Sequence, residues 1–332
     1  MSAPVGWGIL GAGRISTLAV GPALAASQLC HIAAIGARHA DRAAALGSRL
    51  AEPGDASPRA YGSYEQVIAD PAVEVVYIAL PNDAHLPWAL EALRADKHVL
   101  CEKPLGLDAA EVAAAFDVAE ETGALLVEAS WYRWHPRTQE AERMIAEGEL
   151  GRVASVDASF VFDGVPVGDF RMDPGRGGGA LYDVGCYAVS AVGWATGWAG
   201  VTRSEAEVRT HDSGVDLATS ARFEAGDAAV TVRAAIDQPA AQRLEIHGTA
   251  GTLRFGPPAF TAWSGGSAAL EVAGVDGSVS IREFPPVDPY RRMVDAVAGR
   301  VRGRDEWVVP RRDSEWVAAV LDTLRARPGE TG

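Results

Sequence analysis

Lys103 lies between Glu102 and Pro104, directly after the apolar run "KHVL". Proline has no amide hydrogen to donate and restricts the conformation of the residue before it, so a strand is expected to end here. In an open α/β sheet, ligands bind at the carboxyl ends of the strands. The pattern predicts a lysine held at such an edge, where it is either a catalytic group or a surface charge.

A second set of reactive side chains lies in "FRMDPGRGGGALYDVGCYAVSAV", residues 170–192. Asp183 and Tyr187 are four residues apart, which places them on one face of a helix. Tyrosine, with an ordinary pKa of about 10, is a poor base near neutral pH unless a cation favours its phenolate, and Lys103 could supply that cation. Three consecutive glycines before the helix would let the backbone pass close to a flat ligand. The alternative is a helix cap at Asp183 and a packing role for Tyr187.

The segment "GWGILGAGRIS" has the spacing G-x-G-x-x-S at Gly11, Gly13 and Ser16, between an apolar run and a helical stretch. The first glycine allows a tight turn and the second lets a pyrophosphate approach the backbone, while the helix amino terminus supplies free N–H groups. The motif alone is weak, but its position at the start of a β-α-β series strengthens it. It favours dinucleotide binding over an ordinary tight turn.

The end of the second strand distinguishes NAD from NADP, because an acid there binds the ribose 2′-hydroxyl and an arginine accommodates a 2′-phosphate. This sequence reads "GARHADRA", with Arg38 in that position, and its first acid is Asp41 in the following helix. We therefore predict NADP as the cofactor, with NAD as the less favoured choice. The alternative is that Arg38 is an ordinary surface arginine at a solvated helix start.

The composition is that of a folded globular protein: 332 residues, 48% hydrophobic and 22% charged, enough for two domains. Acidic residues outnumber basic ones, 44 to 30, and the net charge of −14 argues against binding to nucleic acid. No apolar run approaches the roughly 20 residues of a membrane helix, and the amino terminus lacks a signal-peptide pattern. Three widely spaced cysteines favour a reduced, cytoplasmic protein, and neither they nor the histidines have metal-ligand spacing.

Short apolar runs alternate with alanine-rich stretches up to about residue 126. Strands are expected in "KHVLCEKP", in "ALLVEAS" and at 5–11, 30–38 and 73–81. Strands that alternate with helices imply right-handed β-α-β crossovers and a mostly parallel sheet. The sequence therefore predicts an α/β protein with a Rossmann dinucleotide-binding domain over 1–126.

After that point a helix is expected over 135–151, followed by period-two runs typical of an antiparallel meander. A helical insert at 178–197 interrupts the meander. Two more helices, at 288–301 and 311–327, complete an α+β domain that we expect to run from 127 to 332.

Besides the glycine turn, four motifs occur in the order found in one family: "ALPNDAH" (79–85), "EKPLG" (102–106), "RWHP" (133–136) and "GGGALYDVGCY" (177–187). On these motifs, which span nearly the whole chain, the protein resembles the glucose–fructose oxidoreductase/inositol dehydrogenase (Gfo/Idh/MocA) family. The resemblance implies a second domain that binds substrate and carries a large open, mainly antiparallel sheet. It also implies NAD(P)-dependent redox chemistry on sugars, polyols or related hydroxy compounds.

Carried over position by position, the resemblance implies that Lys103 is the family's catalytic lysine and Asp183 its aspartate. Tyr187 stands where many members have histidine, which is similar to the branch of dihydrodiol dehydrogenases, aldose dehydrogenases and nucleotide-sugar ketoreductases, where tyrosine is the proposed general acid/base. Phe170-Arg171 replaces a common Trp-Arg pair near the cofactor. The expected cofactor-binding residues are Gly11, Gly13, Arg14, Ile15, Arg38, Leu80, Pro81, Asn82, His85, Glu102, Lys103 and Arg171.

Arg133, in "WYRWHP", could reach the active site because it follows the last Rossmann strand. The expected substrate-binding residues are therefore Lys103, Arg133, Asp183 and Tyr187. Its aromatic neighbours either line a sugar site or pack at the domain interface; they are Trp131, Tyr132 and Trp134. His135 precedes a proline and a helix, so a capping or packing role is favoured over catalysis.

The leading hypothesis is an NADP-linked reductase or dehydrogenase acting on a sugar-like or cyclic alcohol or ketone. One alternative is a non-catalytic cofactor-sensing regulator, which would have no need of Lys103, Asp183 and Tyr187. Another is an NAD-dependent glycoside hydrolase, which Arg38 and Tyr187 disfavour. An open sheet with one uncovered face would expose apolar area that pairing buries, which predicts a homodimer or homotetramer. No nucleic acid or membrane partner is expected.

Overall fold

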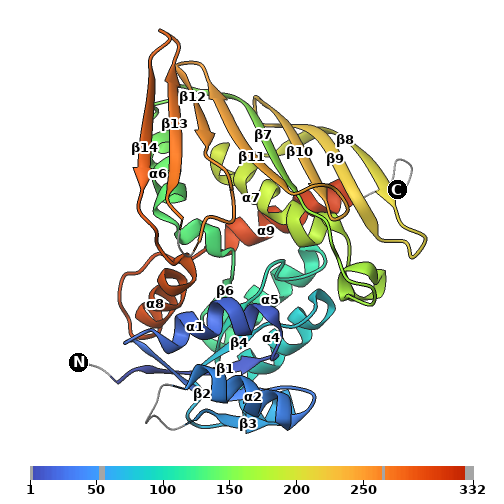
Figure 1. The fold of residues 1–332 in the computed structure, drawn as a ribbon, viewed down its shortest axis with the longest axis vertical. Helices are drawn as coiled ribbons and strands as arrows, with labels where there is room; N and C mark the ends of the chain where they lie inside the picture. Colours follow the sequence, from blue (N-terminus) through green and yellow to red (C-terminus); the bar gives the residue numbers. More distant parts are fainter. Residues whose placement is uncertain (1–2, 52–56, 264–265, 326–332) are drawn as a thin grey trace. The chain divides into compact units, whose positions relative to one another are not determined.

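The computed structural model describes residues 3–51, 57–263 and 266–325 (Figure 1). Within them the chain forms two compact units. The first comprises the chain up to Gly106, Ala110–Trp131 and Asp288–Arg311; the second comprises Leu107–Ala109, Tyr132–Val287 and the residues from Arg312 onward. In the described part of the chain, no helix has both the length and the apolar character needed to cross a membrane.

Six parallel strands form the sheet of the first unit: β1 (Val5–Leu10), β2 (Cys30–Gly36), β3 (Arg59–Tyr61), β4 (Val75–Ile78), β5 (His98–Cys101) and β6 (Leu126–Glu128). Their order is β3-β2-β1-β4-β5-β6. Strands β1 and β4 are buried at every position, as expected for central parallel strands covered on both faces. The order reverses between β1 and β4, which is the switch point where such sheets bind ligands.

The connections between these strands are helical. They are a π-helical turn (Ser16–Val20) continued by α1 (Gly21–Ala25), α2 (Ala40–Leu50), α3 (Tyr64–Ile68), α4 (His85–Arg94) and α5 (Ala109–Thr122). In α5 the buried residues recur three and four positions apart, at Val112, Ala115, Phe116 and Ala119. The predicted Rossmann domain with a parallel sheet is therefore confirmed.

Helix α8 (Pro289–Val301) belongs to the first unit, although the sequence predicted that the second domain would run unbroken from 127 to 332. Asp288 caps the helix by accepting hydrogen bonds from the N–H groups of residues 290 and 291. The helix packs against α1 and β2, and Tyr290 stacks on Trp131 with ring centroids 4.5 Å apart. The observed division differs from the predicted one because α8 buries its apolar face in the first unit.

Eight strands form the sheet of the second unit: β7 (Val153–Val161), β8 (Val201–Thr210), β9 (Asp216–Ala225), β10 (Ala228–Ala235), β11 (Ala241–Gly248), β12 (Gly251–Phe255), β13 (Ala268–Gly274) and β14 (Val279–Phe284). Their order is β14-β13-β12-β11-β7-β10-β9-β8. Strands β7 and β10 pair in parallel and all other neighbours are antiparallel. The sheet is mainly antiparallel, as predicted, but it is not a simple meander because β7 lies between β10 and β11.

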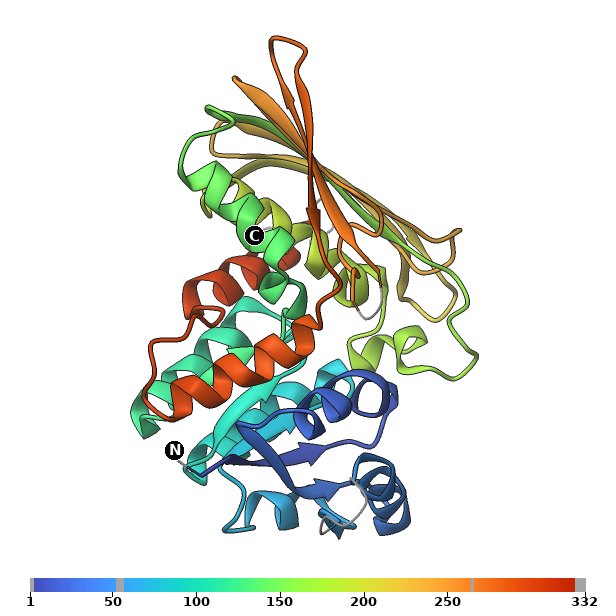
Figure 2. The same ribbon diagram turned by 60° about the vertical axis from the view of Figure 1, so that its left-hand side comes forward.

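Helices α6 (Pro136–Ala146) and α7 (Cys186–Ala195) pack on this sheet, and most of α9 (Arg311–Arg325) also belongs to the second unit (Figure 2). The outward-pointing side chains of the strands form ion pairs across the sheet. Arg243 pairs with Asp157 and Glu245, and Arg254 pairs with Glu245 and Glu271. The uncovered face is therefore charged over β7, β11, β12 and β13, where an apolar area was expected, while Val279 and Ile281 of β14 are exposed on the same face.

Candidate active site

The glycine turn joins β1 to the first helix and leaves its backbone open on one side. Gly11 has a φ of +106°, and a Cβ there would lie 2.5 Å from the carbonyl oxygen of Ala79, so glycine is required. The Ser16 hydroxyl donates to the Gly11 carbonyl at 2.7 Å. Nothing lies within 4 Å of the Cβ position of Gly13, so a pyrophosphate can approach the backbone there. The turn therefore fits a dinucleotide, and the helix beside it opens with Arg14 and Ile15.

Two arginines lie near the end of β2, where NAD and NADP are distinguished. Arg38 follows the strand by two residues and is exposed. The guanidinium of Arg42 donates to the carbonyl of Ala12, in the glycine turn, at 3.3 Å. This contact places a second cation beside the turn. The arrangement suits a 2′-phosphate, which arginine binds through charge-assisted hydrogen bonds.

The loop after β4 is tied to the loop after β5 by His85. His85 has no exposed surface, its Nδ1 lies 2.7 Å from the carbonyl oxygen of Pro104, and its Nε2 lies 2.9 Å from that of Leu80. Burial lowers the pKa of His85, and a neutral imidazole has one N–H, so it donates to one carbonyl at a time. Pro81 and the buried Asn82 lie between the tied positions. The imidazole of His85 therefore contacts the backbone of both loops and holds them close together.

Lys103 lies at the carboxyl edge of the parallel sheet, because β5 ends at Cys101. The peptide bond to Pro104 is cis, and both neighbours of Lys103 are buried whereas Lys103 is partly exposed. Glu102 is 8% exposed, and its Oε1 accepts a hydrogen bond from the hydroxyl of Tyr77 at 2.8 Å. Burial raises the pKa of Glu102, and the positive charge of Lys103 opposes that rise. The buried residues Glu102 and Pro104 thus hold Lys103 at the edge of the sheet where ligands bind.

In the second unit, Asp183 lies in a π-helical turn (Leu181–Gly185) that leads into α7. Its Oδ2 is 2.7 Å from Nε of Arg171, and Nη1 of Arg171 is 3.1 Å from Oδ1 of Asp169. The same guanidinium lies over the ring of Phe170, 4.6 Å from the centroid. Arg171 is therefore held by two carboxylates, one of which is that of Asp183.

The glycine run before this turn packs against the chain itself. A Cβ at Gly178 would lie 2.6–2.7 Å from the carbonyl oxygens of residues 170, 171 and 173, and a Cβ at Gly179 would lie 1.9 Å from Oδ1 of Asp216. These contacts within the chain explain why glycine is needed at both positions. A flat ligand close to the backbone, which the sequence suggested, is not needed to explain them. Asp216 also accepts a hydrogen bond from the N–H of Leu181 at 2.8 Å. No signal in the sequence identifies Asp216, which is 35 residues from Leu181.

Aromatic rings of the second unit surround Tyr187, which is 8% exposed. Its ring centroid lies 5.4 Å from that of Phe160, 5.6 Å from that of Tyr132 and 6.1 Å from that of Phe260. Such contacts fix the orientation of the ring and keep water from the sides that they cover. The phenol is therefore positioned by packing from β7, the 3-10 turn Trp131–Trp134 and the loop after β12.

Arg133 is buried in the second unit, where carboxylates pair with its guanidinium. The side chain is 3% exposed, with Nε and Nη2 donating to Glu142 at 2.6 and 3.0 Å and Nη1 donating to Asp313 at 3.2 Å. Its guanidinium also lies over the ring of Trp198, 5.5 Å from the centroid. These contacts favour a packing role for Arg133 over substrate binding.

The neighbours of Arg133 are buried too. The hydroxyl of Tyr132 donates to Ser190 at 2.8 Å and accepts from Nε1 of Trp194 at 3.1 Å, and Trp134 is 2% exposed. Nδ1 of His135 accepts a hydrogen bond from the backbone N–H of residue 137 at 3.0 Å, so His135 caps α6 as predicted. This segment therefore builds the core of the second unit.

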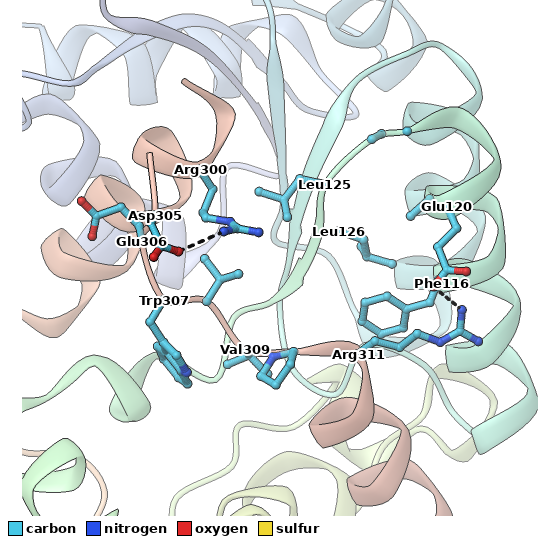
Figure 3. A pocket seen from close by; sticks show the side chains of 15 residues that line it. Phe116, Glu120, Leu125, Leu126, Arg300, Asp305, Glu306, Trp307, Val309 and Arg311 are labelled. Carbon is cyan, nitrogen blue, oxygen red and sulfur yellow. Dashed lines mark hydrogen bonds and ion pairs between the residues drawn. The ribbon is translucent and has the colours of Figure 1, made fainter. Parts of the chain in front are cut away.

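A groove of about 700 Å³ lies in the first unit, away from the ligand edge (Figure 3). Figure 3 shows Phe116, Leu125 and Leu126 on one wall and Arg300 and Trp307 on the other. The wall at 123–126 leads into the start of β6, so the groove lies at the amino ends of the parallel strands. Cofactors bind such sheets at the opposite edge. Among the described residues, no cluster of histidine, cysteine and acidic side chains could hold a metal ion.

Known proteins resemble this chain in sequence and in fold. Residues 5–130 match the family described as "Oxidoreductase family, NAD-binding Rossmann fold", and residues 138–254 match the "GFO/IDH/MocA C-terminal domain". The chain is 40% identical over 332 residues to D-xylose 1-dehydrogenase (NADP(+)) 2 of Haloferax volcanii, covering 98% of each protein. It is 30% identical over 341 residues to human trans-1,2-dihydrobenzene-1,2-diol dehydrogenase, covering 98% of this chain and 97% of the relative.

A similar solved structure is that of a 3-ketoreductase from Actinomadura kijaniata in complex with NADP and TDP-benzene. It matches with a TM-score of 0.87 and 28% sequence identity, covering 97% of each chain. These relatives fall in the branch expected from Tyr187. Both domains match the family's models, and a dehydrogenase is similar to the chain along nearly its whole length. The chain therefore belongs to the Gfo/Idh/MocA family of oxidoreductases.

Proposed function

We propose that the protein is an NADP-linked oxidoreductase that transfers hydride between nicotinamide and a sugar-like or cyclic alcohol or ketone. The observation that carries the proposal is Lys103, partly exposed between buried neighbours at the carboxyl edge of a parallel sheet whose glycine turn fits a dinucleotide. The similarity to an NADP-dependent D-xylose 1-dehydrogenase makes aldoses the first substrates to test.

The preference for NADP rests on the end of β2. Arg38 stands where an acid would favour NAD, and Arg42 touches the glycine turn. Gly11, Gly13, Arg14 and Ile15 are proposed to hold the pyrophosphate, while the loop Leu80–Asn82 and Glu102 hold the nicotinamide half. His85 serves the same half through its contacts with the Leu80 and Pro104 carbonyls.

The bound nicotinamide supplies or accepts the hydride. The protein must then move a proton at the substrate oxygen, and we assign that proton to the phenol of Tyr187. In the reductive direction Tyr187 donates it, and the cationic Lys103 stabilises the oxygen that gains negative charge. The carboxylate of Asp183, oriented by Arg171, is proposed to hold a substrate hydroxyl. Oxidation uses the same groups in reverse.

The test begins with cofactor binding. Purified protein is titrated with NADPH and separately with NADH while tryptophan fluorescence is followed, since the chain has nine tryptophans. Tighter binding of NADPH justifies a screen of D-xylose, other aldoses and keto-sugars, with NADPH formation or consumption as the signal. Binding of neither cofactor would refute the proposed function.

The screen also separates the two other hypotheses. A cofactor-sensing regulator would bind NADPH without turning over any substrate. A glycoside hydrolase would release a leaving group with no net change in the cofactor.

A homodimer or homotetramer remains part of the proposal. Light scattering of the purified protein gives the oligomeric state directly. The proposed setting is the cytoplasm, in keeping with three buried cysteine thiols.

A further inference from the structure

The helix that carries Asp183 and Tyr187 begins without a capping residue of its own. Ala180 occupies the cap position, and its side chain has no atom that can accept a hydrogen bond. The first N–H groups of a helix have no partner within the helix and need an acceptor from elsewhere. Here the acceptor is Asp216, the first residue of β9, whose Oδ2 takes the hydrogen bond from the N–H of Leu181 at 2.8 Å.

The carboxylate of Asp216 is itself held in place. The hydroxyl of Thr219, which is 1% exposed, donates to the same Oδ2 at 2.9 Å. Burial raises the pKa of Asp216, and its hydrogen bonds with Leu181 and Thr219 oppose that rise. A desolvated carboxylate with fixed partners is a more rigid acceptor than a solvated one.

Gly179, the residue before the cap, has no side chain and so leaves room for this carboxylate. Gly179 has a φ of +109°, and a Cβ there would lie 1.9 Å from Oδ1 of Asp216. The Gly179 carbonyl accepts the N–H of Asp183 at 3.2 Å, while its own N–H donates to the carbonyl of Arg171 at 2.9 Å. The same short segment therefore connects Asp216 to Asp183 and to the arginine that pairs with Asp183.

We propose that Asp216 is a positioning residue, whose carboxylate fixes the start of the helix and thereby the places of Asp183 and Tyr187. This inference rests on the proposed function, because only the proposed proton transfer gives the position of Tyr187 a catalytic consequence. Misplacing a reacting group by about 1 Å can reduce turnover about 100-fold. Asp216 touches neither cofactor nor substrate in this scheme.

The test compares Asp216→Ala with Asp216→Asn, which keeps one acceptor oxygen. We expect Asp216→Ala to lower kcat by about 10- to 100-fold, and Asp216→Asn to stay within about threefold of wild type. The Kd for NADPH, whose proposed site belongs to the first unit, should stay within about twofold. The control is Asp276→Ala, because Asp276 caps the turn between β13 and β14 in the same way but is exposed.

Hydrogen exchange at residues 181–187 tests the positioning without relying on turnover. Faster exchange in Asp216→Ala but not in Asp276→Ala supports the inference, and unchanged exchange overturns it. If exchange rises while wild type turns over no sugar or ketone, the proposed function fails and the helix contact stands. If Asp216→Ala does not fold, Thr219→Val replaces it, because it removes the hydroxyl that holds Oδ2 of Asp216, and unchanged kcat and exchange in that variant overturn the inference.

Discussion

The hydroxyl of Tyr77 donates a hydrogen bond to Oε1 of Glu102 at 2.8 Å, one residue before Lys103. Tyr77 is on β4 and Glu102 follows β5, so the bond crosses two neighbouring strands at their carboxyl ends. Burial raises the pKa of Glu102, whose carboxylate also accepts the backbone N–H of Lys103. This pair therefore sets the backbone from which Lys103 emerges.

Tyr77→Phe removes the donor and leaves a buried carboxyl short of one partner. We expect the free energy of unfolding to fall by about 1–3 kcal/mol, because an unsatisfied buried polar group costs that much. Urea denaturation of the two proteins measures it. The control is Tyr61→Phe, which removes a hydrogen bond to Asp70 from a half-buried tyrosine and should cost less. Equal losses in both variants would contradict the role given to the Tyr77 bond.

Glu102→Gln should change how stability depends on pH. The pKa of Glu102 in the folded protein lies above its usual 4.5, so the folded state holds this proton more tightly than the unfolded state. The stabilisation is complete below pH 4.5 and is lost as the pH rises through the raised pKa. Relative to wild type, Glu102→Gln should therefore gain stability on going from acid to neutral pH. Urea denaturation across that range checks it, and parallel profiles would refute it.

Arg38→Ala should weaken NADPH binding and leave NADH binding unchanged, since only NADPH carries the 2′-phosphate. Loss of a charge-assisted contact predicts a rise in Kd for NADPH of about tenfold or more. Fluorescence titration measures both cofactors in each protein. Arg49→Ala, an exposed arginine at the end of α2, is the control and should bind both as wild type does. A similar loss for the two cofactors would remove Arg38 from the discrimination.

The parts of the fold that could be predicted are those with a local signal. Strands such as β1 and β4 are apolar throughout, and Pro104 marks where β5 must end. Strand β8 could not be predicted because it has no apolar face: "VTRSEAEVRT" is exposed at nearly every position and is held by pairing with β9. The place of α8 was missed because its packing partners are far away in the sequence.

At the candidate site, too, residues with a local sequence signal could be predicted and residues without one could not. Lys103, Asp183 and Tyr187 stand in short motifs, so their positions could be read from the chain. The residues that support them have no motif: Tyr77 bonds to a glutamate 25 residues away, and Asp216 meets Leu181 only because β9 starts beside the helix. Arg133 resembled a site residue by its position, yet its partners Glu142 and Asp313 place it in the core.

Lys103→Ala should abolish turnover while leaving cofactor binding nearly unchanged. Loss of a group that acts in proton transfer costs about 10²- to 10⁴-fold in kcat, whereas the glycine turn and the end of β2 remain intact. The chain offers a close control, because Lys97 is its other lysine and lies before β5 rather than after it. Its amine donates to the carbonyls of residues 70 and 73 at 3.3 and 2.8 Å, so Lys97→Ala should cost stability but not activity. Kinetics and NADPH titration of both variants decide the matter: weak cofactor binding with normal kcat in Lys103→Ala would make Lys103 a cofactor ligand instead of a catalytic residue.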